Sequence, residues 1–406
     1  MKKIKETLIT PEKYSCDVCV CGGGVAGIAA ALSAKRAGAN DVILLERGFM
    51  LGGLATAGLV TIYLALCDGY GHQISYGLTE ELLRLSIEYG AEDRYPTAWL
   101  DGGTLEERKK RRFEVQFNAQ LFAMSAEQLL KREGVHIIYG AQVAGAVVDD
   151  GKIRDIIIEG KGGREAIEIR SSVVDATGDA DVCKLAGAKT ATYAPGNKLA
   201  AWYYGYGNQN FKLYMCGVLD VVNDADATAL NDKRRFSGLD TDELSEMMQI
   251  SHNATLHNLL EKRKKVADLV PTTIATTPEV RMTRRIVGAF TQDITAENET
   301  YPDSVGIYPN WKKPGPVYEL PLSALYGNEV KNLIVAGRCI STTDEMWDVT
   351  RVIPVCAVSG EAAGAAAAMS SDFANMDVSE LQSYLKSAGV KLHRHELGFK
   401  IKGELK

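Results

Sequence analysis

The first sixty residues alternate short apolar runs with glycine-bearing turns. An apolar run at 18–21 leads into a glycine-rich turn at 22–27, and small residues continue through 28–34. A second apolar run, at 42–45, ends on Glu46. A buried strand, a tight turn, a helix of small residues and a second strand make up a parallel βαβ unit. This pattern therefore predicts an α/β fold with a Rossmann-like first half.

The glycine-rich turn has the spacing Gly22-x-Gly24-x-x-Gly27. In such a turn the first glycine permits the tight bend, the second lets a pyrophosphate approach the backbone, and the third lets helix and strand pack closely. The helix N-terminus, at Val25 and Ala26, then faces the phosphate charge. Glu46 lies about 20 residues further on, where an acidic side chain can accept from ribose hydroxyls. Together these features predict a dinucleotide site.

Two further glycine-bearing turns follow predicted strands. The turn at 52–58 comes directly after the second strand, and its Thr56 is a candidate hydroxyl donor to a cofactor. The alternative is a loop that needs glycine only for a positive φ. The turn at 176–181 follows a short apolar run at 173–175. Its small residues let the chain pass close to a cofactor, although Gly178 and its acidic neighbours also suit a plain turn.

Between these turns the pattern predicts a helix and a small meander. Asn118 is a suitable N-cap for a helix over 119–133, and Gly134 ends it. The charge run at 106–112 indicates a solvated face. Glycine-bearing turns separate four predicted strands, which span 135–139, 142–148, 153–158 and 166–169.

From about 190 to 320 the α/β rhythm is lost. A helix is expected over 241–265 and a strand over 281–287. Alternation along that strand places Arg284 on the apolar face, where a guanidinium needs a partner. Arg284 is therefore either a core ion pair or the holder of a substrate anion. This stretch is predicted to be an inserted α+β substrate domain.

The main sheet is expected to return at 332–338. A loop is predicted over 341–351, and Pro354 suits the first turn of a core helix that is rich in Gly and Ala. The first helix of the chain has an equally small-residue face, so both helices permit close approach. An amphipathic helix over 378–386 ends the pattern. The predicted divisions are a first part of the dinucleotide-binding domain at 1–195, an inserted substrate domain at 196–320, a second part of the dinucleotide-binding domain at 321–375 and a peripheral helix and tail at 376–406.

Composition narrows the range of partners. The 406 residues are 46% hydrophobic and 24% charged, with a net charge of −6, which argues against a general binder of nucleic acid or anionic membranes. The basic N-terminus leads into no apolar signal segment, and 352–369 is interpreted as a buried helix. The eight cysteines include one Cys-x-x-Cys, at 16–19, but its two side chains point to opposite faces of a predicted strand and no second such pair occurs. We therefore expect reduced thiols, a cytoplasmic protein and no metal site.

These motifs, with the blocks at 335–338 and 347–354, resemble the bacterial FAD-dependent oxidoreductases of the glutathione-reductase-type flavoprotein superfamily. The likeness covers nearly the whole chain. It implies a Rossmann-like FAD-binding domain with a β-meander and an inserted substrate domain, and FAD as the cofactor. The chain lacks a second Gly-x-Gly-x-x-Gly after a strand, and it has no closely spaced cysteine pair where a flavin-reduced disulfide would sit in that superfamily. A dedicated nicotinamide domain and disulfide reductase chemistry are therefore not expected.

The resemblance also implies a set of cofactor contacts. The three turns would hold the pyrophosphate and ribityl chain, Val143 would touch adenine, and the residues before Pro354 would face the flavin pyrimidine. The full set of predicted FAD contacts is Gly22, Gly24, Val25, Ala26, Gly27, Glu46, Arg47, Gly53, Leu54, Ala55, Thr56, Val143, Ala176, Thr177, Gly178, Asp179, Gly337, Arg338, Arg351 and Ile353.

The expected reaction is hydride transfer between a small organic substrate and flavin N5. His72, in a loop rich in Gly and Tyr, is the first acid–base candidate because its reference pKa lies near neutral, and a surface loop histidine is the alternative. Tyr204, Arg284 and Arg351 are candidates for anchoring the substrate. The alternatives are a flavoprotein acting in RNA modification and a nicotinamide-dependent Rossmann dehydrogenase. The sequence leaves open which molecule donates or accepts the electrons and whether the protein forms a homo-oligomer.

Overall fold

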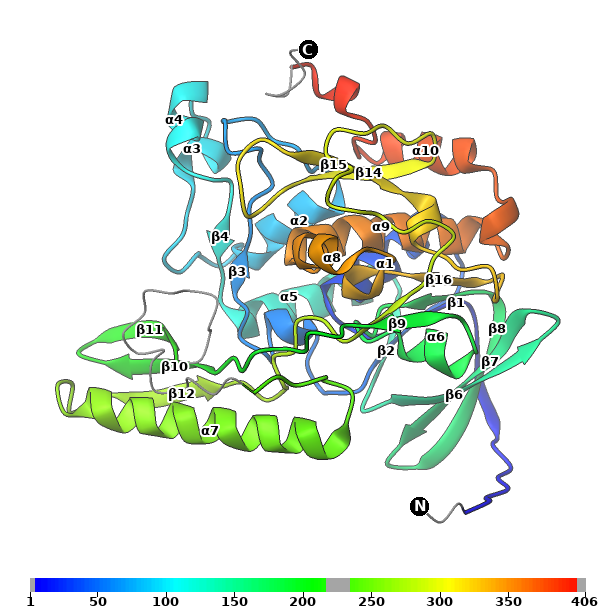
Figure 1. Ribbon diagram of the computed structural model, residues 1–406, viewed down its shortest axis with the longest axis horizontal. Coiled ribbons are helices and arrows are strands. Elements are labelled where there is room, and N and C mark those ends of the chain that lie inside the picture. The colour runs from blue at the N-terminus through cyan, green and yellow to red at the C-terminus, as the bar shows by residue number, and fades with distance from the viewer. Residues whose placement is uncertain (1–3, 217–233, 400–406) are drawn as a thin grey trace.

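The computed structural model describes residues 4–216 and 234–399. Its centre is a seven-stranded sheet in the order β5-β2-β1-β8-β7-β6, with β16 paired to β8 as well (Figure 1). The strands of this sheet are β1 (Glu12–Cys21), β2 (Val42–Glu46), β5 (His136–Tyr139), β6 (Gln142–Asp149), β7 (Lys152–Gly160), β8 (Gly163–Asp175) and β16 (Leu333–Val335).

The sheet combines a parallel core with an antiparallel meander. Strands β5, β2, β1, β8 and β16 pair in parallel, and β8, β7 and β6 pair antiparallel. The expected mixed α/β fold is confirmed. The prediction of separate strands at 166–169 and 173–175 is wrong, because β8 runs unbroken for 13 residues. The polar residues at 170–172 fall where the register of β8 against β1 shifts, and pairing on both sides, at Ile169 and Ser172, lets the strand continue across them.

Helices α1 (Val25–Arg36) and α9 (Ile353–Met369) pack against each other beside this sheet, next to α2 (Leu78–Ser86) and α5 (Ala119–Arg132) (Figure 1). Their small faces bring the two backbones together. A Cβ on Gly364 would lie 2.1 Å from the Ala30 carbonyl oxygen, and Ser33 donates a 2.6 Å hydrogen bond to the Glu361 carbonyl. Asn118 caps α5 as predicted, its side chain accepting from two backbone N–H groups.

A second layer lies apart from this core, at the lower left of Figure 1. Here β11 (Asn210–Met215), β10 (Trp202–Gly207) and β12 (Val270–Ile274) form a sheet with α7 (Thr241–Arg263) against it. Tyr203 lies on the sheet face that packs with Leu259 of α7. The buried residues of α7 recur every four positions, which is the spacing of one helix face.

The segment predicted as one strand over 281–287 is mostly irregular. Only β13 (Arg284–Ile286) pairs, with β9 (Thr190–Thr192). Before it, the Asn197 side chain accepts from the backbone N–H groups of Arg281 and Met282 and donates to the Met282 carbonyl. The prediction of a full-length strand failed because a distant amide side chain, instead of a neighbouring strand, satisfies this backbone.

The remaining elements complete the outer layers. The loop expected over 341–351 instead contains a short helix, α8, whose Trp347 is fully buried, and the charge run at 106–112 lies largely in α4, which has no buried residue. Strands β14 and β15 pack into the main core beside α9. These elements are β3 (Ile62–Tyr63), α3 (Thr97–Leu100), α4 (Leu105–Lys110), β4 (Val115–Gln116), α6 (Asp181–Leu185), β14 (Ser304–Pro309), β15 (Val317–Pro321), α8 (Asp344–Thr350) and α10 (Val378–Ser387).

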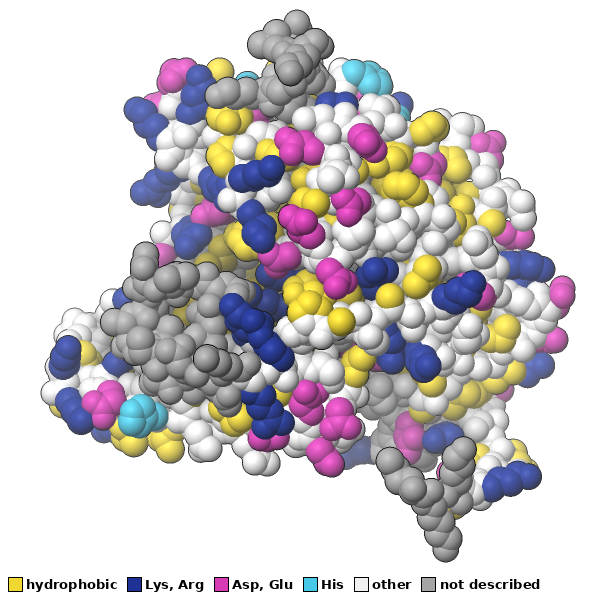
Figure 2. Space-filling model, in the orientation of Figure 1, with side chains coloured by type: hydrophobic (Ala, Val, Ile, Leu, Met, Phe, Trp, Pro, Cys, Tyr) yellow, Lys and Arg dark blue, Asp and Glu magenta, His cyan; other side chains and the backbone are white. Residues whose placement is uncertain are grey.

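The distribution of charged side chains and the lengths of the apolar helices agree with what the composition indicates. Figure 2 shows acidic and basic side chains interspersed over the visible face. Among the described residues no single helix is long and apolar enough to cross a membrane; α8 and α9 reach that length only as a pair bent by 90°. Helix α9 is the buried core helix that was predicted. All eight cysteines lie within the described residues and have free thiols.

Candidate cofactor site

A cavity of about 360 Å³ opens where β1, β2, β8 and β16 end. This volume lies within the range of small-molecule sites, and the carboxyl ends of parallel strands are where such folds bind nucleotides. The lining consists of residues 22–26, 45–50, 52–55, 57, 141–143, 176–178, 181, 276–278, 280, 336–338, 351, 353 and 356. Every predicted FAD contact lies in this lining except Gly27, Thr56 and Asp179.

The first glycine turn is built as a phosphate cradle. Gly22 has φ +109°, and a Cβ there would lie 2.4 Å from the Ala176 carbonyl oxygen. A Cβ on Gly27 would lie 1.8 Å from the Gly22 carbonyl oxygen, so Gly27 acts in packing and not in lining. Around Gly24 a Cβ would meet no atom within 4 Å, and α1 begins there without a side-chain cap. The first-turn N–H groups of α1 therefore face open space suited to an anion.

Glu46 is held rigidly at the end of β2. Its two carboxylate oxygens accept from the backbone N–H groups of Gly23, at 2.9 Å, and Gly48, at 2.6 Å. A carboxylate has about four acceptor positions, so these two bonds leave capacity for hydroxyl donors. Arg47 and Val143 line the same end of the cavity. This arrangement fits the ribose and adenine of a dinucleotide.

The second glycine turn differs from the prediction at Thr56. The Thr56 side chain is fully buried, and its hydroxyl donates to the carbonyl oxygens of Leu51, at 2.5 Å, and Gly53, at 3.3 Å. It therefore closes the turn on itself and does not reach the cavity. Gly53, Leu54 and Ala55 present the lining in its place.

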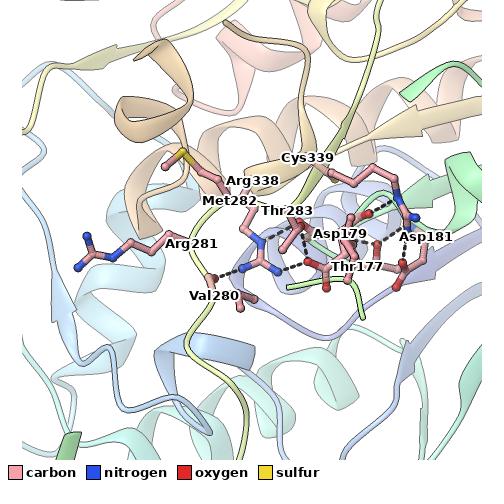
Figure 3. A network of polar contacts seen from close by, with 12 residues as sticks. Thr177, Asp179, Asp181, Val280, Arg281, Met282, Thr283, Arg338 and Cys339 are labelled. Carbon is pink, nitrogen blue, oxygen red and sulfur yellow. Dashed lines mark hydrogen bonds and ion pairs between the residues drawn. The ribbon is translucent and has the colours of Figure 1, made fainter. Parts of the chain in front are cut away.

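The third turn is organised by a buried carboxylate at the end of β8. Asp175 accepts from the N–H and hydroxyl of Thr177, at 3.1 and 2.6 Å, and from the N–H of Cys183 at 2.9 Å. Burial raises the pKa of Asp175, whereas these hydrogen bonds lower it. Asp179 does not line the cavity; its carboxylate binds Arg338 and the Thr283 hydroxyl (Figure 3).

The opposite end of the cavity lies at the start of α9. Ile353 is the first residue of that helix, and the Arg351 guanidinium before it makes two bonds to one Asp348 oxygen, at 2.9 and 2.5 Å. Cys356 is the one thiol of the eight in the lining, and burial raises its pKa to about 12. The stretch 276–284 from the inserted region forms the facing wall, and its residues 276–278 and 280 line the cavity.

Sequence reasoning missed this wall, together with Cys356 and Asp181. The lining residues of the wall have no distinctive types, and the one signal in the sequence is their place directly before the predicted strand at 281–287. Cys356 follows Pro354 by two residues, so its place in the first turn of α9 was readable from the predicted helix start.

The catalytic candidates lie apart from one another. His72 is outside the lining: its Nδ1 lies 3.0 Å from Asp68 Oδ2 and its ring stacks on Phe399 at 4.1 Å. The structure thus places His72 outside the cavity lining, and its role as an acid–base group stays a prediction. Arg351 is the one catalytic candidate in the lining.

Tyr204 and Arg284 also lie outside the lining. The buried Tyr204 hydroxyl donates to Glu92 Oε2 at 2.6 Å and hydrogen-bonds Thr61 at 2.7 Å; burial raises its pKa. Arg284 forms an ion pair with Asp181 at 2.5 Å, which agrees with the ion-pair alternative. Both side chains are therefore engaged in contacts between elements and do not reach into the cavity.

Comparison with known proteins adds a family assignment. The family model for FAD dependent oxidoreductases matches residues 17–213 and 192–385. A thioredoxin reductase of Ureaplasma parvum serovar 3 is 40% identical over 79 residues, which is 19% of this chain and 25% of that protein. The chain thus spans a quarter of the length of this curated relative.

Two solved structures align along most of the chain. The p-nitrophenol 4-monooxygenase of Pseudomonas putida DLL-E4 is 13% identical, with a TM-score of 0.47 and coverage of 93% of this chain and 82% of that one. A geranylgeranyl bacteriochlorophyll reductase-like protein of Thermoplasma acidophilum is also 13% identical, with a TM-score of 0.44 and coverage of 92% and 84%.

The family match and the cavity agree on the cofactor. The open space at Gly24, the uncapped start of α1 and the fixed Glu46 carboxylate suit a dinucleotide, and the family model extends over both the sheet and the inserted region. The chain is a member of the FAD-dependent oxidoreductase family, and its cofactor is FAD.

Proposed function

We propose that this oxidoreductase transfers a hydride between a small organic substrate and N5 of its flavin. The observation that carries the proposal is the composition of the cavity. One side consists of the glycine turns, and the other is the wall formed by Thr276, Thr277, Pro278 and Val280. A small molecule that enters along this wall would lie beside the part of the cofactor at the start of α9.

Bound FAD supplies the redox chemistry, because its ring system accepts or gives the hydride. The chain supplies orientation and charge. The 17-residue helix α9 begins at Ile353 in the lining, and the partial positive charge at a helix N-terminus stabilises negative charge on a reduced ring. Arg351 stands at the same end, held by Asp348, and is the candidate anchor for an anionic group of the substrate.

The proton that accompanies the hydride needs a donor or acceptor other than His72. Within the described lining the ionisable side chains are Glu46, Arg47, Asp181, Arg338, Arg351 and Cys356. Arginine stays charged, and the raised pKa of Cys356 keeps its thiol protonated at neutral pH. The Cys356 thiol, at the α9 end, donates to the Arg351 carbonyl oxygen at 3.4 Å and stays neutral, so we assign the exchange of that proton to solvent.

The test is anaerobic reduction of the holoenzyme by a panel of small organic hydride donors, followed through the visible flavin absorbance. The expected result is bleaching by one substrate class, or reoxidation of the reduced enzyme by the matching acceptor. Thr277→Trp should slow bleaching by organic donors at least 10-fold, since the indole fills the wall side, while Thr277→Ser should not. Both variants should be reduced equally by dithionite, which needs no substrate site.

Two results would contradict the proposal. One is a holoenzyme that no organic donor bleaches and no organic acceptor reoxidises. The other is a Thr277→Trp variant that turns over organic donors as fast as the unmodified enzyme while it retains a full complement of FAD.

A further inference from the structure

The wall has little regular structure to hold it in place. It continues from the end of β12 to the start of β13, and its residues 275–283 form no helix or strand. Thr276 donates a 2.8 Å hydrogen bond to the Ala57 carbonyl at one end. At the other end, the Tyr193 N–H binds the Thr283 carbonyl, and side chains from turns that follow β8 and β16 make the remaining contacts.

Arg338 makes the central connection. It follows β16 and lines the cavity, and its guanidinium reaches both sides of the site (Figure 3). Its Nε donates to the Gly178 carbonyl at 2.7 Å, its Nη1 to the Val280 carbonyl, and its Nη2 to Asp179. Three of the five guanidinium N–H groups are thus directed to protein acceptors, and one N–H on each Nη remains. The same side chain therefore contacts a cofactor turn and the wall.

Asp179 makes a second set of hydrogen bonds to the wall. One carboxylate oxygen accepts from Arg338 and, at 2.6 Å, from the hydroxyl of Thr283, which is 1% exposed. The next residue, Arg284, donates to the Asp179 carbonyl at 2.9 Å. Figure 3 shows Arg281 directed away from this cluster, so Thr283 and Arg284 carry these contacts.

The backbone at this point is in an uncommon conformation. Ala180, directly after Asp179, has φ +50° and is fully buried. An L-residue rarely adopts this left-handed conformation unless its surroundings impose it. The strained residue lies between Asp179 and Asp181, the two acidic residues that hold Thr283 and Arg284.

We propose that Arg338, Asp179 and Thr283 form a clamp through which bound FAD fixes the wall at 276–284. FAD would contact Thr177, Gly178, Gly337 and Arg338 in the lining, and Arg338 and Asp179 pass that order on to Val280 and Thr283. Asp179 and Thr283 are thus positioning residues. The proposal rests on the proposed function, because the wall is taken as the substrate side. Coupling of this kind is reciprocal, so fixing the wall also tightens FAD binding.

The test compares Thr283→Val with Thr283→Ser in FAD titrations of the apoprotein and in hydrogen exchange of the apo and holo forms. Valine keeps the shape of threonine but removes the donor to Asp179, whereas serine keeps the donor. FAD should slow amide exchange over 276–284 in the unmodified protein and in Thr283→Ser. In Thr283→Val this FAD-induced protection should be lost, and FAD affinity should fall about 5- to 10-fold, at the lower end of typical coupling.

A merely structural role for Thr283 would lower stability but leave the FAD-induced protection unchanged, and that result would overturn the clamp. Should Thr283→Val fail to fold, the unmodified protein still decides the question. Residues 281–284 lie outside the lining, so equal exchange there with and without FAD rejects the clamp, and protection there, without protection of β10 and β11, supports it. No step uses turnover, so a failed search for substrates would reject the proposed function and leave this result standing.

Discussion

The floor of the cavity, residues 22–27, 52–55 and 176–178, and its wall at 276–284 differ in what holds their backbones. Backbone hydrogen bonds hold much of the floor: the Gly22 N–H binds the Leu45 carbonyl, and the Gly52 N–H binds the Gly23 carbonyl. The wall has one backbone bond near each end, at Thr276 and Thr283, and is otherwise held by side chains from distant elements, including Asn197, Arg338 and Asp179. Many substitutions in the floor would therefore bring a new side chain against backbone atoms. In the wall, a single substitution can remove one of the side-chain contacts and leave the others in place.

The largest expected effect separates two glycines of the floor. Gly27→Ala places a Cβ 1.8 Å from the Gly22 carbonyl oxygen, so both folding and FAD binding should be lost. Gly24→Ala meets no neighbour, and Gly24 has an ordinary backbone conformation, with φ −67° and ψ 179°. This variant should keep its melting temperature within a few degrees while FAD affinity falls at least 10-fold, because the methyl group occupies the phosphate side. Calorimetry and FAD titration check both variants, and unchanged FAD affinity in Gly24→Ala would contradict the cradle.

The next effect concerns two buried glutamates, one in the wall and one in the core helix α9. Burial raises the pKa of Glu279, in the wall, to about 8, and that of Glu361, in α9, to about 8. An unfolded glutamate titrates near pH ~4.3, so between about pH 4.5 and 8 the folded protein retains protons that the unfolded chain has released. The free energy of unfolding therefore falls as the pH rises through this window.

Replacing either glutamate removes its share of that pH dependence. The difference in free energy of unfolding between Glu279→Gln and the unmodified protein should shift by about 1–3 kcal/mol in favour of the variant between pH 5 and pH 8. This follows because a shift of one pKa unit is worth about 1.4 kcal/mol. Glu361→Gln is the matched variant in the core. Denaturant unfolding at the two pH values measures both. If only Glu361→Gln flattens the profile, then water reaches Glu279 and the wall is looser than the core.

A smaller effect tests whether the stability of helix α7, in the second layer, can change without a change in FAD binding. Asp240 caps α7 by accepting from the Glu243 N–H at 2.9 Å, and Asn118 caps α5 by accepting from Gln120 and Leu121. Loss of such a cap costs about 1 kcal/mol. Asp240→Ala and Asn118→Ala should both lower the free energy of unfolding by this amount. Asp240→Ala should also leave FAD affinity within twofold, and a larger change would mean that α7 itself contributes to the site.

The smallest expected effect is at His72. The His72 ring pairs with Asp68 and stacks on Phe399 outside the cavity. The flavin of the His72→Ala variant should therefore be reduced by an organic donor at a rate within twofold of that of the unmodified enzyme. Stopped-flow reduction by the same donor measures this rate. A 10-fold loss would bring His72 back as an acid–base group and require a rearrangement of its loop.

Sequence patterns predicted the floor well because its geometry is local. Gly22, Gly27 and Glu46 lie within 25 residues of one another, and their roles follow from steric limits on a tight turn. Helix α8 was missed because it lies in a polar segment of seven residues, and the burial of Trp347 depends on packing that no local pattern records. The place of the wall was unpredictable for the same reason, since Asn197 and Arg338 lie far from it in the chain.

The unbroken course of β8 has a consequence for ligand choice. One end of this strand carries the hairpin on which β6 and Val143 are built, and the other leads into the turn at Thr177. Between them β8 has one extra residue relative to β1, because Cys16 pairs with Ile169 and Val18 pairs with Ser172, and such an irregularity bends a strand. The bend helps to set the separation of the two contact points, and a flavin without its adenylyl half would reach only one of them, so we expect the protein to bind FAD in preference to FMN.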